Sequence, residues 1–311
     1  MSNRVLTITM NPAVDVNSEA DKVVTNQKVR CEKPDYDPGG GGINVARVLT
    51  RLGIQANAFY LAGGITGEYL TYLLDEENVP HKHSKINGMT RENTSVIDRN
   101  TGEQYRFVFP GPTIENAEWK NTLDWIEENL NDFDIVVGSG SLPPGVPTDF
   151  YSMVGSIVLE NGKEFILDTS GDFLSEGLKN GATYIKPNQE EFEELKKQKE
   201  ADSMDDLLEQ LFSQGVENVI YTLGSEETKL INKNGSTSFK PPQIEVNSSI
   251  GAGDSFVGGL VAGLVTGMST RDAVLFGIAT AASTLKSFGT DLCELEDVKS
   301  IYKDLSSTKK S

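Results

Sequence analysis

The chain has 311 residues, of which 37% are hydrophobic and 24% are charged. This composition is typical of a soluble globular protein with a full core, in one large domain or two smaller ones. No run of about 18 apolar residues is present, which argues against a membrane span. The net charge of −18 makes nucleic acid an unfavourable partner, so an anionic ligand would need a local basic cluster.

Strand-like and helix-like segments alternate along most of the chain. We expect strands at 5–9, 56–61, 134–138, 164–168, 184–187 and 219–224, and helices at 42–52, 67–77, 149–160 and 189–199. Short apolar runs that end at glycine indicate the strands, and apolar residues at helical spacing indicate the helices. This alternation predicts an α/β fold with a mostly parallel sheet covered on both faces. Ligands of such sheets bind beyond the carboxyl ends of the strands.

Two stretches interrupt the alternation. Residues 13–37 contain short apolar pairs without a helical period, and residues 91–109 contain two strand-like runs around the turn Asn100-Thr101-Gly102. The second pattern predicts a β-hairpin. We expect both inserts to form a small separate sheet that acts as a lid on a single domain covering residues 1–311. Since the N-terminus leads into a strand without a signal-peptide pattern, we expect a cytoplasmic protein.

A glycine turn with an acidic neighbour gives the strongest chemical signal. Residues 247–255 read Asn-Ser-Ser-Ile-Gly-Ala-Gly-Asp-Ser, and a long apolar segment that reads as a buried helix follows. Such a turn at a helix N-terminus presents unpaired backbone N–H groups, which stabilise an anion. Asp254 in the first turn has two interpretations: a helix cap, or a base beside the place where negative charge develops.

A second glycine-rich segment, Gly39-Gly40-Gly41-Gly42, opens the predicted helix at 42–52. Consecutive glycines are costly in entropy, so we attribute them to a ligand that approaches bare backbone rather than to a flexible loop. Asn44 in the first turn is placed to hydrogen-bond a hydroxyl group. The chain has no Walker A sequence and no Gly-x-Gly-x-x-Gly fingerprint after the first strand, which argues against P-loop and dinucleotide-binding sites.

Four basic residues, Lys28, Arg30, Arg91 and Arg106, lie in or beside the two inserts. Each one alone fits ordinary surface charge, but as a group in an acidic chain they favour a phosphate clamp.

The segment Lys186-Pro187-Asn188-Gln189-Glu190-Glu191 joins a strand end to a helix. Asn188 with Glu191 three residues later fits a capping box. The same pair also fits a site that organises water-bound Mg²⁺ near nucleotide phosphates. Local sequence reasoning does not choose between these interpretations.

Over essentially its whole length the chain resembles the ribokinase-like (PfkB) family of sugar kinases. Residues 39–46, with Gly53 and Gly63 downstream, resemble the first family signature, and residues 247–255 resemble the second. Residues 11–15 and 186–191 resemble the branch that contains 6-phosphofructokinase, 1-phosphofructokinase and tagatose-6-phosphate kinase. Residues 102–107 and 139–145, together with Gly41, are most similar to the minor 6-phosphofructokinase of that branch. Relatives that act on fructose 1-phosphate or tagatose 6-phosphate typically have Lys at the position of Gly41.

The resemblance implies a three-layer α/β/α fold with a small β-sheet lid, and a kinase that uses ATP and Mg²⁺. Fructose 6-phosphate is the expected substrate. Tagatose 6-phosphate and fructose 1-phosphate are alternatives, and a silent sugar-phosphate sensor is a further one. The lid strands of this branch pair between two subunits, so a homodimer is implied. Lys286 and Asp291 depart from the minor phosphofructokinase near the adenine and cation region, which leaves a role for K⁺ open.

The resemblance also implies roles for particular residues. Asp254 would be the general base, and the amides of Gly251, Ala252 and Gly253 would hold the developing charge. The sugar phosphate would be bound by Asp15, Lys28, Arg30, Gly40, Gly41, Asn44, Arg91, Arg106 and Ser139. The nucleotide would be bound by Lys186, Asn188, Thr222, Gly224 and Ser249, with Glu191 acting on Mg²⁺ through water.

Overall fold

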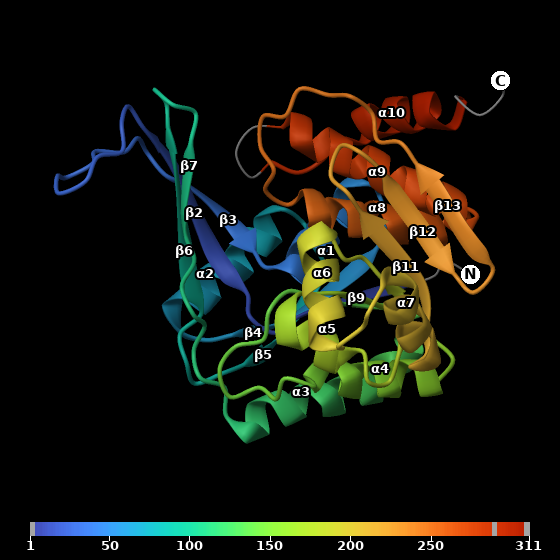
Figure 1. The fold of residues 1–311 in the computed structure, drawn as a ribbon. Helices are drawn as coiled ribbons and strands as arrows, with labels where there is room; N and C mark the ends of the chain where they lie inside the picture. Colours follow the sequence, from blue (N-terminus) through green and yellow to red (C-terminus); the bar gives the residue numbers. More distant parts are fainter. Residues whose placement is uncertain (1–3, 288–290, 308–311) are drawn as a thin grey trace.

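A nine-stranded sheet forms the centre of the molecule, as the computed structural model shows for residues 4–287 and 291–307 (Figure 1). The strand order is β13-β12-β11-β10-β9-β8-β1-β4-β5. Neighbouring strands pair in parallel, except that β12 pairs antiparallel with both β11 and the edge strand β13. The strands are β1 (Val5–Thr9), β4 (Ala56–Ala62), β5 (His81–Lys85), β8 (Ile135–Ser139), β9 (Glu164–Asp168), β10 (Ala182–Ile185), β11 (Val216–Thr222), β12 (Thr228–Asn232) and β13 (Gly235–Phe239).

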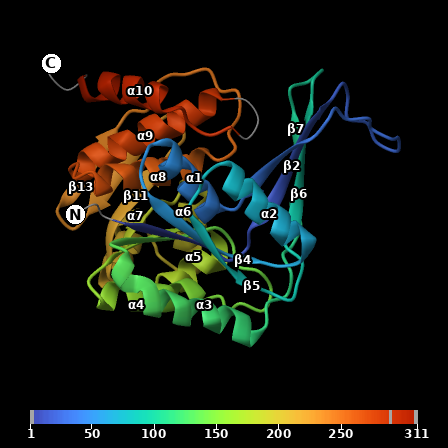
Figure 2. The same ribbon diagram turned by 180° about the vertical axis from the view of Figure 1, so that it is seen from behind.

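Helices cover both faces of this sheet (Figures 1 and 2). One face carries α1 (Gly41–Arg51), α2 (Gly64–Glu76), α8 (Ala252–Val265), α9 (Thr270–Lys286) and α10 (Leu295–Ser307). The other face carries α3 (Asn116–Asn129), the short η1 (Leu130–Asp132), α4 (Phe150–Glu160), α5 (Gly171–Gly177), α6 (Gln189–Gln198) and α7 (Met204–Ser213). The three-layer α/β/α architecture is therefore confirmed.

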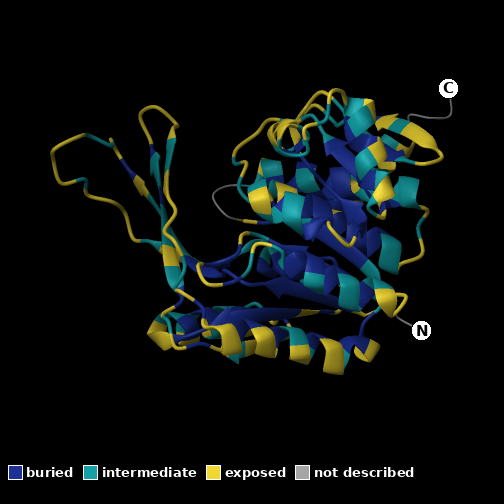
Figure 3. Ribbon diagram, turned by 60° about the horizontal axis from the view of Figure 1, so that its bottom comes forward, coloured by how far each residue is buried: buried dark blue, intermediate teal, exposed yellow. Residues whose placement is uncertain are grey.

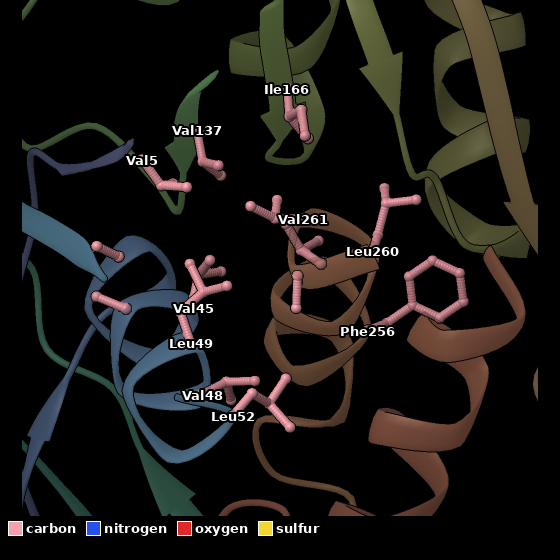
Figure 4. Close-up of a cluster of buried hydrophobic side chains, with 14 of the residues drawn as sticks. Val5, Val45, Val48, Leu49, Leu52, Val137, Ile166, Phe256, Leu260 and Val261 are labelled. Carbon is pink, nitrogen blue, oxygen red and sulfur yellow. The ribbon is translucent and has the colours of Figure 1, made fainter. Parts of the chain in front are cut away.

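Two hydrophobic cores lie on the two faces of the sheet. Successive side chains of a strand point to opposite faces, so Val5 of β1 belongs to one core and Leu6 to the other. In the first core, Val45 of α1 and Val261 of α8 lie beneath Val137 of β8 (Figure 4). The tight contact between α1 and α8 needs a glycine, because a Cβ at Gly258 would lie 2.4 Å from a methyl carbon of Val48. This packing brings the N-termini of α1 and α8 to the same end of the sheet.

The two inserts form a separate four-stranded sheet in the order β3-β2-β6-β7. Its strands are β2 (Ala13–Ala20), β3 (Asp35–Gly39), β6 (Arg91–Asp98) and β7 (Gln104–Phe107), and the central pair β2–β6 is parallel. The hairpin predicted around residues 100–102 is confirmed. The tips of this sheet project from the body and are largely exposed (Figure 3).

Some elements differ from the sequence-based expectation. The helix expected at 67–77 begins at Gly64, whose φ of 67° lets the chain turn directly from β4 into α2. Strands β5, β12 and β13 were not expected: the edge strand β5 (His-Lys-His-Ser-Lys) has no buried residue, and the short β12 and β13 contain only Leu230, Ile231 and Phe239 as buried apolar residues. No helix within residues 4–287 and 291–307 is long and apolar enough to cross a membrane.

Candidate active site

The candidate site lies beyond the carboxyl ends of the parallel strands, where the N-termini of α1 and α8 also meet. Ser139 ends β8, Asp168 ends β9 and Thr222 ends β11, while Lys186 follows β10 directly. Parallel strands end at one edge of a sheet, so these side chains gather although they are far apart in sequence.

The N-terminus of α8 presents unpaired amides. Gly251 is the N-cap with φ 71°, a left-handed conformation that glycine adopts without strain. The amide of Ser255 donates to the carbonyl oxygen of Gly251 (2.8 Å), which is the first bond of the helix. The amides of Ala252 and Gly253 precede it and have no partner inside the helix, so they are available to an anion together with the helix dipole.

Asp254 lies in the first turn of α8 and is hydrogen-bonded to the opposite helix. Its Oδ2 accepts a hydrogen bond of 2.8 Å from Nδ2 of Asn44 on α1. Burial raises the pKa of Asp254 to about 7, with a further contribution from Asp168, while the Asn44 bond and Lys186 act in the opposite direction. A carboxyl group with a pKa near neutrality suits an acceptor of protons. This geometry favours the base interpretation over the cap interpretation.

Lys186 places a buried positive charge beside the α8 N-terminus. Its ammonium forms an ion pair with Asp168 (3.1 Å), and both side chains are largely buried. A Cβ built on Gly253 would lie only 3.6 Å from the Lys186 ammonium. A cation therefore lies beside the turn that carries the two amides, which is the kind of environment that stabilises a transferred phosphoryl group.

Asp15 of β2 lies where the lid sheet meets the body. Nδ2 of Asn93 on β6 donates to its Oδ1 (2.8 Å). Burial raises the pKa of Asp15, and the two lid cations Arg106 and Arg91 oppose this shift. Asp15, Asn93 and Arg106 line a small pocket, which Ile250, the residue before Gly251, also lines. The pocket thus connects the lid to the anion-binding turn.

The four predicted lid cations are not equivalent in the structure. Arg91 is partly buried and donates to the carbonyl oxygens of Phe109 (2.8 Å) and Asn11 (2.9 Å), so it also ties the lid to the body. Arg106 is exposed on β7 and lines the Asp15 pocket. Lys28 and Arg30 are exposed on the segment between β2 and β3, which projects away from the large sheet (Figure 1). The fold of one chain does not bring these last two to Asp15.

The glycine run at the start of α1 packs against protein atoms. A Cβ on Gly39 would lie 2.2 Å from Oδ2 of Asp15, and one on Gly41 would lie 2.2 Å from Oγ of Ser139. Gly40 has φ 119°, which a side chain would strain. The explanation by ligand approach alone is therefore wrong in part, because Asp15 and Ser139 already occupy the space that side chains would need.

Of the predicted nucleotide-binding residues, Lys186, Asn188 and Thr222 lie around the start of α6, whereas Gly224 follows β11 and Ser249 precedes α8. Asn188 and Glu191 form a capping box: Oδ1 of Asn188 accepts from the amide of Glu191, and Oε2 of Glu191 accepts from the amide of Asn188, both at 2.9 Å. The amide of Thr222 donates to the carbonyl oxygen of Pro187 (3.1 Å), which fixes β11 to this segment. Gly224 has φ 57° and open space around it, and Ser249 is exposed.

Glu191 is the one predicted metal residue. Burial raises the pKa of Glu191, while its bond to the Asn188 amide and the charge of Lys186 oppose the shift. No cluster of three or more acidic, histidine or cysteine side chains suited to a metal occurs among the described residues. A single carboxylate beside a phosphate site fits Mg²⁺, which keeps most of its waters and is bound through one or two carboxylates and substrate phosphates.

Three residues of the site had no role in the sequence analysis: Arg47, Asn93 and Asp168. Asp168 pairs with Lys186, Asn93 bonds Asp15, and Arg47 donates to Oδ1 of Asn44 (3.3 Å). Arg47 left a signal as a charge among the apolar residues of the first predicted helix, and Asp168 left one as the last residue of the strand expected at 164–168.

The fold and the residues at the strand ends define a ribokinase-like kinase. The chain belongs to the pfkB family of carbohydrate kinases, since the sequence model described as "pfkB family carbohydrate kinase" matches residues 3–297. The ATP-dependent 6-phosphofructokinase isozyme 2 of Mycobacterium tuberculosis is 37% identical over 302 residues, covering 96% of this chain and 89% of the relative. The isozyme 2 of Escherichia coli is 35% identical over 307 residues, covering 97% and 99%.

Solved structures of E. coli phosphofructokinase-2 are similar in fold. Its complex with potassium has a TM-score of 0.89 at 35% identity, covering 98% of this chain and 99% of that one. Its complex with fructose-6-phosphate has a TM-score of 0.87 at 34% identity, with the same coverage. A tetrameric inhibited form of the same E. coli protein has a TM-score of 0.89.

Proposed function

We propose that this protein is an ATP-dependent 6-phosphofructokinase that converts fructose 6-phosphate into fructose 1,6-bisphosphate. The observation that carries the proposal is the position of Asp254, whose carboxyl group has a pKa raised to about 7 and lies beside the unpaired amides of α8. Relatives of more than 30% identity over nearly the whole chain carry this activity in their names.

In the proposed reaction, Asp254 accepts the proton of the sugar hydroxyl as that oxygen attacks the γ-phosphorus of ATP. The bond between the γ-phosphorus and the β–γ bridging oxygen breaks, and ADP leaves. The amides of Gly251, Ala252 and Gly253 stabilise the charge on the transferred group. Lys186 adds a positive charge at the same place. Its ion pair with Asp168 already fixes the ammonium, so little reorganisation of the protein is needed during the reaction.

The sugar would lie between the body and the lid. Asp15, Gly40 and Asn44 would bind its hydroxyl groups, with Ser139 nearby. Arg91 and Arg106 would bind its phosphate, because Arg106 lines the Asp15 pocket and Arg91 begins β6 two residues before the Asn93 that bonds Asp15.

Gly41 favours fructose 6-phosphate over the two alternative sugars. A side chain at this position would collide with Oγ of Ser139 at 2.2 Å and approach the backbone of Gly140 at 3.0 Å. The Lys that is typical of tagatose-6-phosphate and fructose-1-phosphate kinases therefore does not fit this backbone arrangement.

The nucleotide would follow the start of α6. Lys186, Asn188, Thr222, Gly224 and Ser249 would line its path, and Glu191 would hold Mg²⁺ through water. Mg²⁺ would neutralise charge on the ATP phosphates. The open question of K⁺ concerns the segment between Lys286 and Asp291, and residues 288–290 lie outside the described part of the chain. Replacement of potassium by tetramethylammonium in the assay tests a requirement for K⁺.

We also propose a homodimer formed by the lid sheets. Phe107, Val108 and Phe109 at the end of the lid hairpin are 53%, 61% and 52% exposed, an apolar strip that pairing of two lids would cover. Lys28 and Arg30 project away from the body, so a second subunit is the place where they would meet a sugar phosphate.

A coupled assay of ADP release tests the function directly. We expect the ratio kcat/KM to be highest for fructose 6-phosphate, lower for tagatose 6-phosphate and lower again for fructose 1-phosphate. A higher value for either alternative sugar would replace the proposed substrate. Absence of ADP release with all three would favour the sensor interpretation.

A further inference from the structure

Arg47 is a buried cation of α1 to which none of the proposed steps assigns a role. It is 2% exposed and lies on a helix whose other buried residues are apolar or glycine. Nε donates to Oε2 of Glu77 (2.7 Å), and Nη2 donates to Oδ1 of Asp37 (3.2 Å). Nη1 donates to the carbonyl oxygen of Pro38 (3.1 Å) and to Oδ1 of Asn44 (3.3 Å). The planar guanidinium thus joins α2, the lid strand β3 and Asn44.

The bond to Asn44 has a consequence for the orientation of the Asn44 amide. A guanidinium has only donors, so the Asn44 atom that faces Arg47 must be the oxygen. The Nδ2 group then points the other way, and it donates to Oδ2 of Asp254 at 2.8 Å. If the amide turned round, its oxygen would face the Asp254 carboxylate and repel it.

We infer that Arg47 is a positioning residue that fixes the Asn44 amide and so keeps a hydrogen-bond donor on the proton-accepting carboxylate of Asp254. The inference rests on the proposed function, in which Asp254 is the general base. The hydrogen bonds of Arg47 go to Glu77, Asp37, Pro38 and Asn44, so its effect on Asp254 passes through Asn44.

The charges around Asp254 show why this donor matters. Asp168 at the end of β9 and Asp15 of β2 both disfavour the ionised form, as does burial. The groups that favour the ionised form are Lys186 beside β10 and the Asn44 amide of α1. Lys186 also forms an ion pair with Asp168, so its positive charge is not devoted to Asp254 alone. Loss or reversal of the Asn44 donor would therefore raise the pKa of Asp254 further and leave less base at neutral pH.

A purely structural role of Arg47 predicts different behaviour. The bonds to Glu77, Asp37 and Pro38 hold α2 and the lid root against α1, and their loss would lower stability and weaken sugar binding at every pH. Glu77→Gln is the matched control, because it weakens the same buried ion pair at the end of α2 without touching Asn44.

The test compares wild type with Arg47→Met, Arg47→Lys and Glu77→Gln by two measurements. The first is a ¹³C NMR titration of the Asp254 carboxyl, assigned by comparison with Asp254→Asn. The second is the pH dependence of kcat/KM for fructose 6-phosphate. A hydrogen bond to a charged group corresponds to a pKa shift of about one unit or more, so we expect Arg47→Met to move both midpoints upward by about that amount. Arg47→Lys should move them in the same direction, because the single nitrogen of lysine cannot replace both the Nε and Nη2 groups that bond Glu77 and Asp37 and the separate Nη1 that donates to Asn44.

The shift in the Asp254 midpoint caused by Arg47→Met should vanish when the Asn44 side chain has already been removed. In an Asn44→Ala background, Arg47→Met should add no further change to the Asp254 midpoint, since the two residues act in series. Unchanged Asp254 midpoints in folded Arg47→Met or Arg47→Lys protein, or an equal shift in Glu77→Gln, would refute the inference. The proposed function fails separately if wild type releases no ADP with fructose 6-phosphate, and the NMR titration would still report on Arg47.

Discussion

Replacement of Asp254 by Asn removes a proton acceptor and keeps a side chain of almost the same shape. Since a general base contributes about 10²–10⁴ in rate, we expect kcat to fall by that factor. The KM values for the sugar phosphate and ATP should change little, because Asn44, Lys186 and the α8 amides remain in place. In wild type, kcat/KM should fall below a pH of about 7 as Asp254 becomes protonated.

The same replacement should stabilise the protein. Because the fold raises the pKa of Asp254 from 3.8 to about 7, this carboxyl contributes stability that is present below pH 3.8 and lost as the pH rises to 7. At about 1.4 kcal/mol per pKa unit, the loss is on the order of 4 kcal/mol. We therefore expect Asp254→Asn to have a higher melting temperature than wild type at pH 8, with the difference disappearing near pH 4.

Steady-state kinetics and thermal unfolding at several pH values measure these two effects. Asp272→Asn is a matched control, because Asp272 occupies the same helix position in α9 and accepts a hydrogen bond from the capping Ser269 (2.7 Å). That control should keep full activity and lose a little stability. Near-normal turnover of Asp254→Asn would refute the base role, and a lower melting temperature at pH 8 would refute the electrostatic argument.

Other changes test the substrate site and the lid. Arg91→Ala should raise KM for fructose 6-phosphate by at least tenfold and also lower stability, because Arg91 bonds two backbone carbonyl oxygens. Arg106→Ala should raise KM alone. An unphosphorylated sugar as the better substrate would contradict both expectations. Gly41→Ala should raise KM through its contact with Ser139, and Ser139→Ala in the same chain should restore part of the loss; an unaffected single variant would contradict the packing argument. Phe107→Asp should convert the proposed dimer into monomers by light scattering, and an unchanged mass would place the interface elsewhere.

Local sequence patterns identified the central parallel strands and the helices α1, α2, α4, α6 and α8, whereas α3, α5, α7, α9 and α10 were not predicted. Apolar runs such as β9 are buried on both faces, so composition alone marks them. The polar edge strand β5 and the β12–β13 hairpin at the other edge escaped prediction, because their environment is set by their place in the sheet and not by their own residues.

The capping box at the start of α6 shows why a motif alone left a choice open. Asn188 and Glu191 do form the box, and the Glu191 carboxylate also lies within the electrostatic reach of Lys186. The local sequence pattern predicts the capping box, whereas the proximity of Glu191 to Lys186 becomes visible only in the fold.

The sequence by itself determined the glycine turn before Asp254, because a left-handed residue at a helix N-terminus requires a particular local sequence. The tertiary structure determined the environment and the ionisation of Asp254. The Asn44 donor comes from 210 positions away, and the Asp168–Lys186 pair comes from two other strand ends. These groups set the ionisation of Asp254 through space, and distances in space follow from the packing of α1 against α8 rather than from the order of residues along the chain.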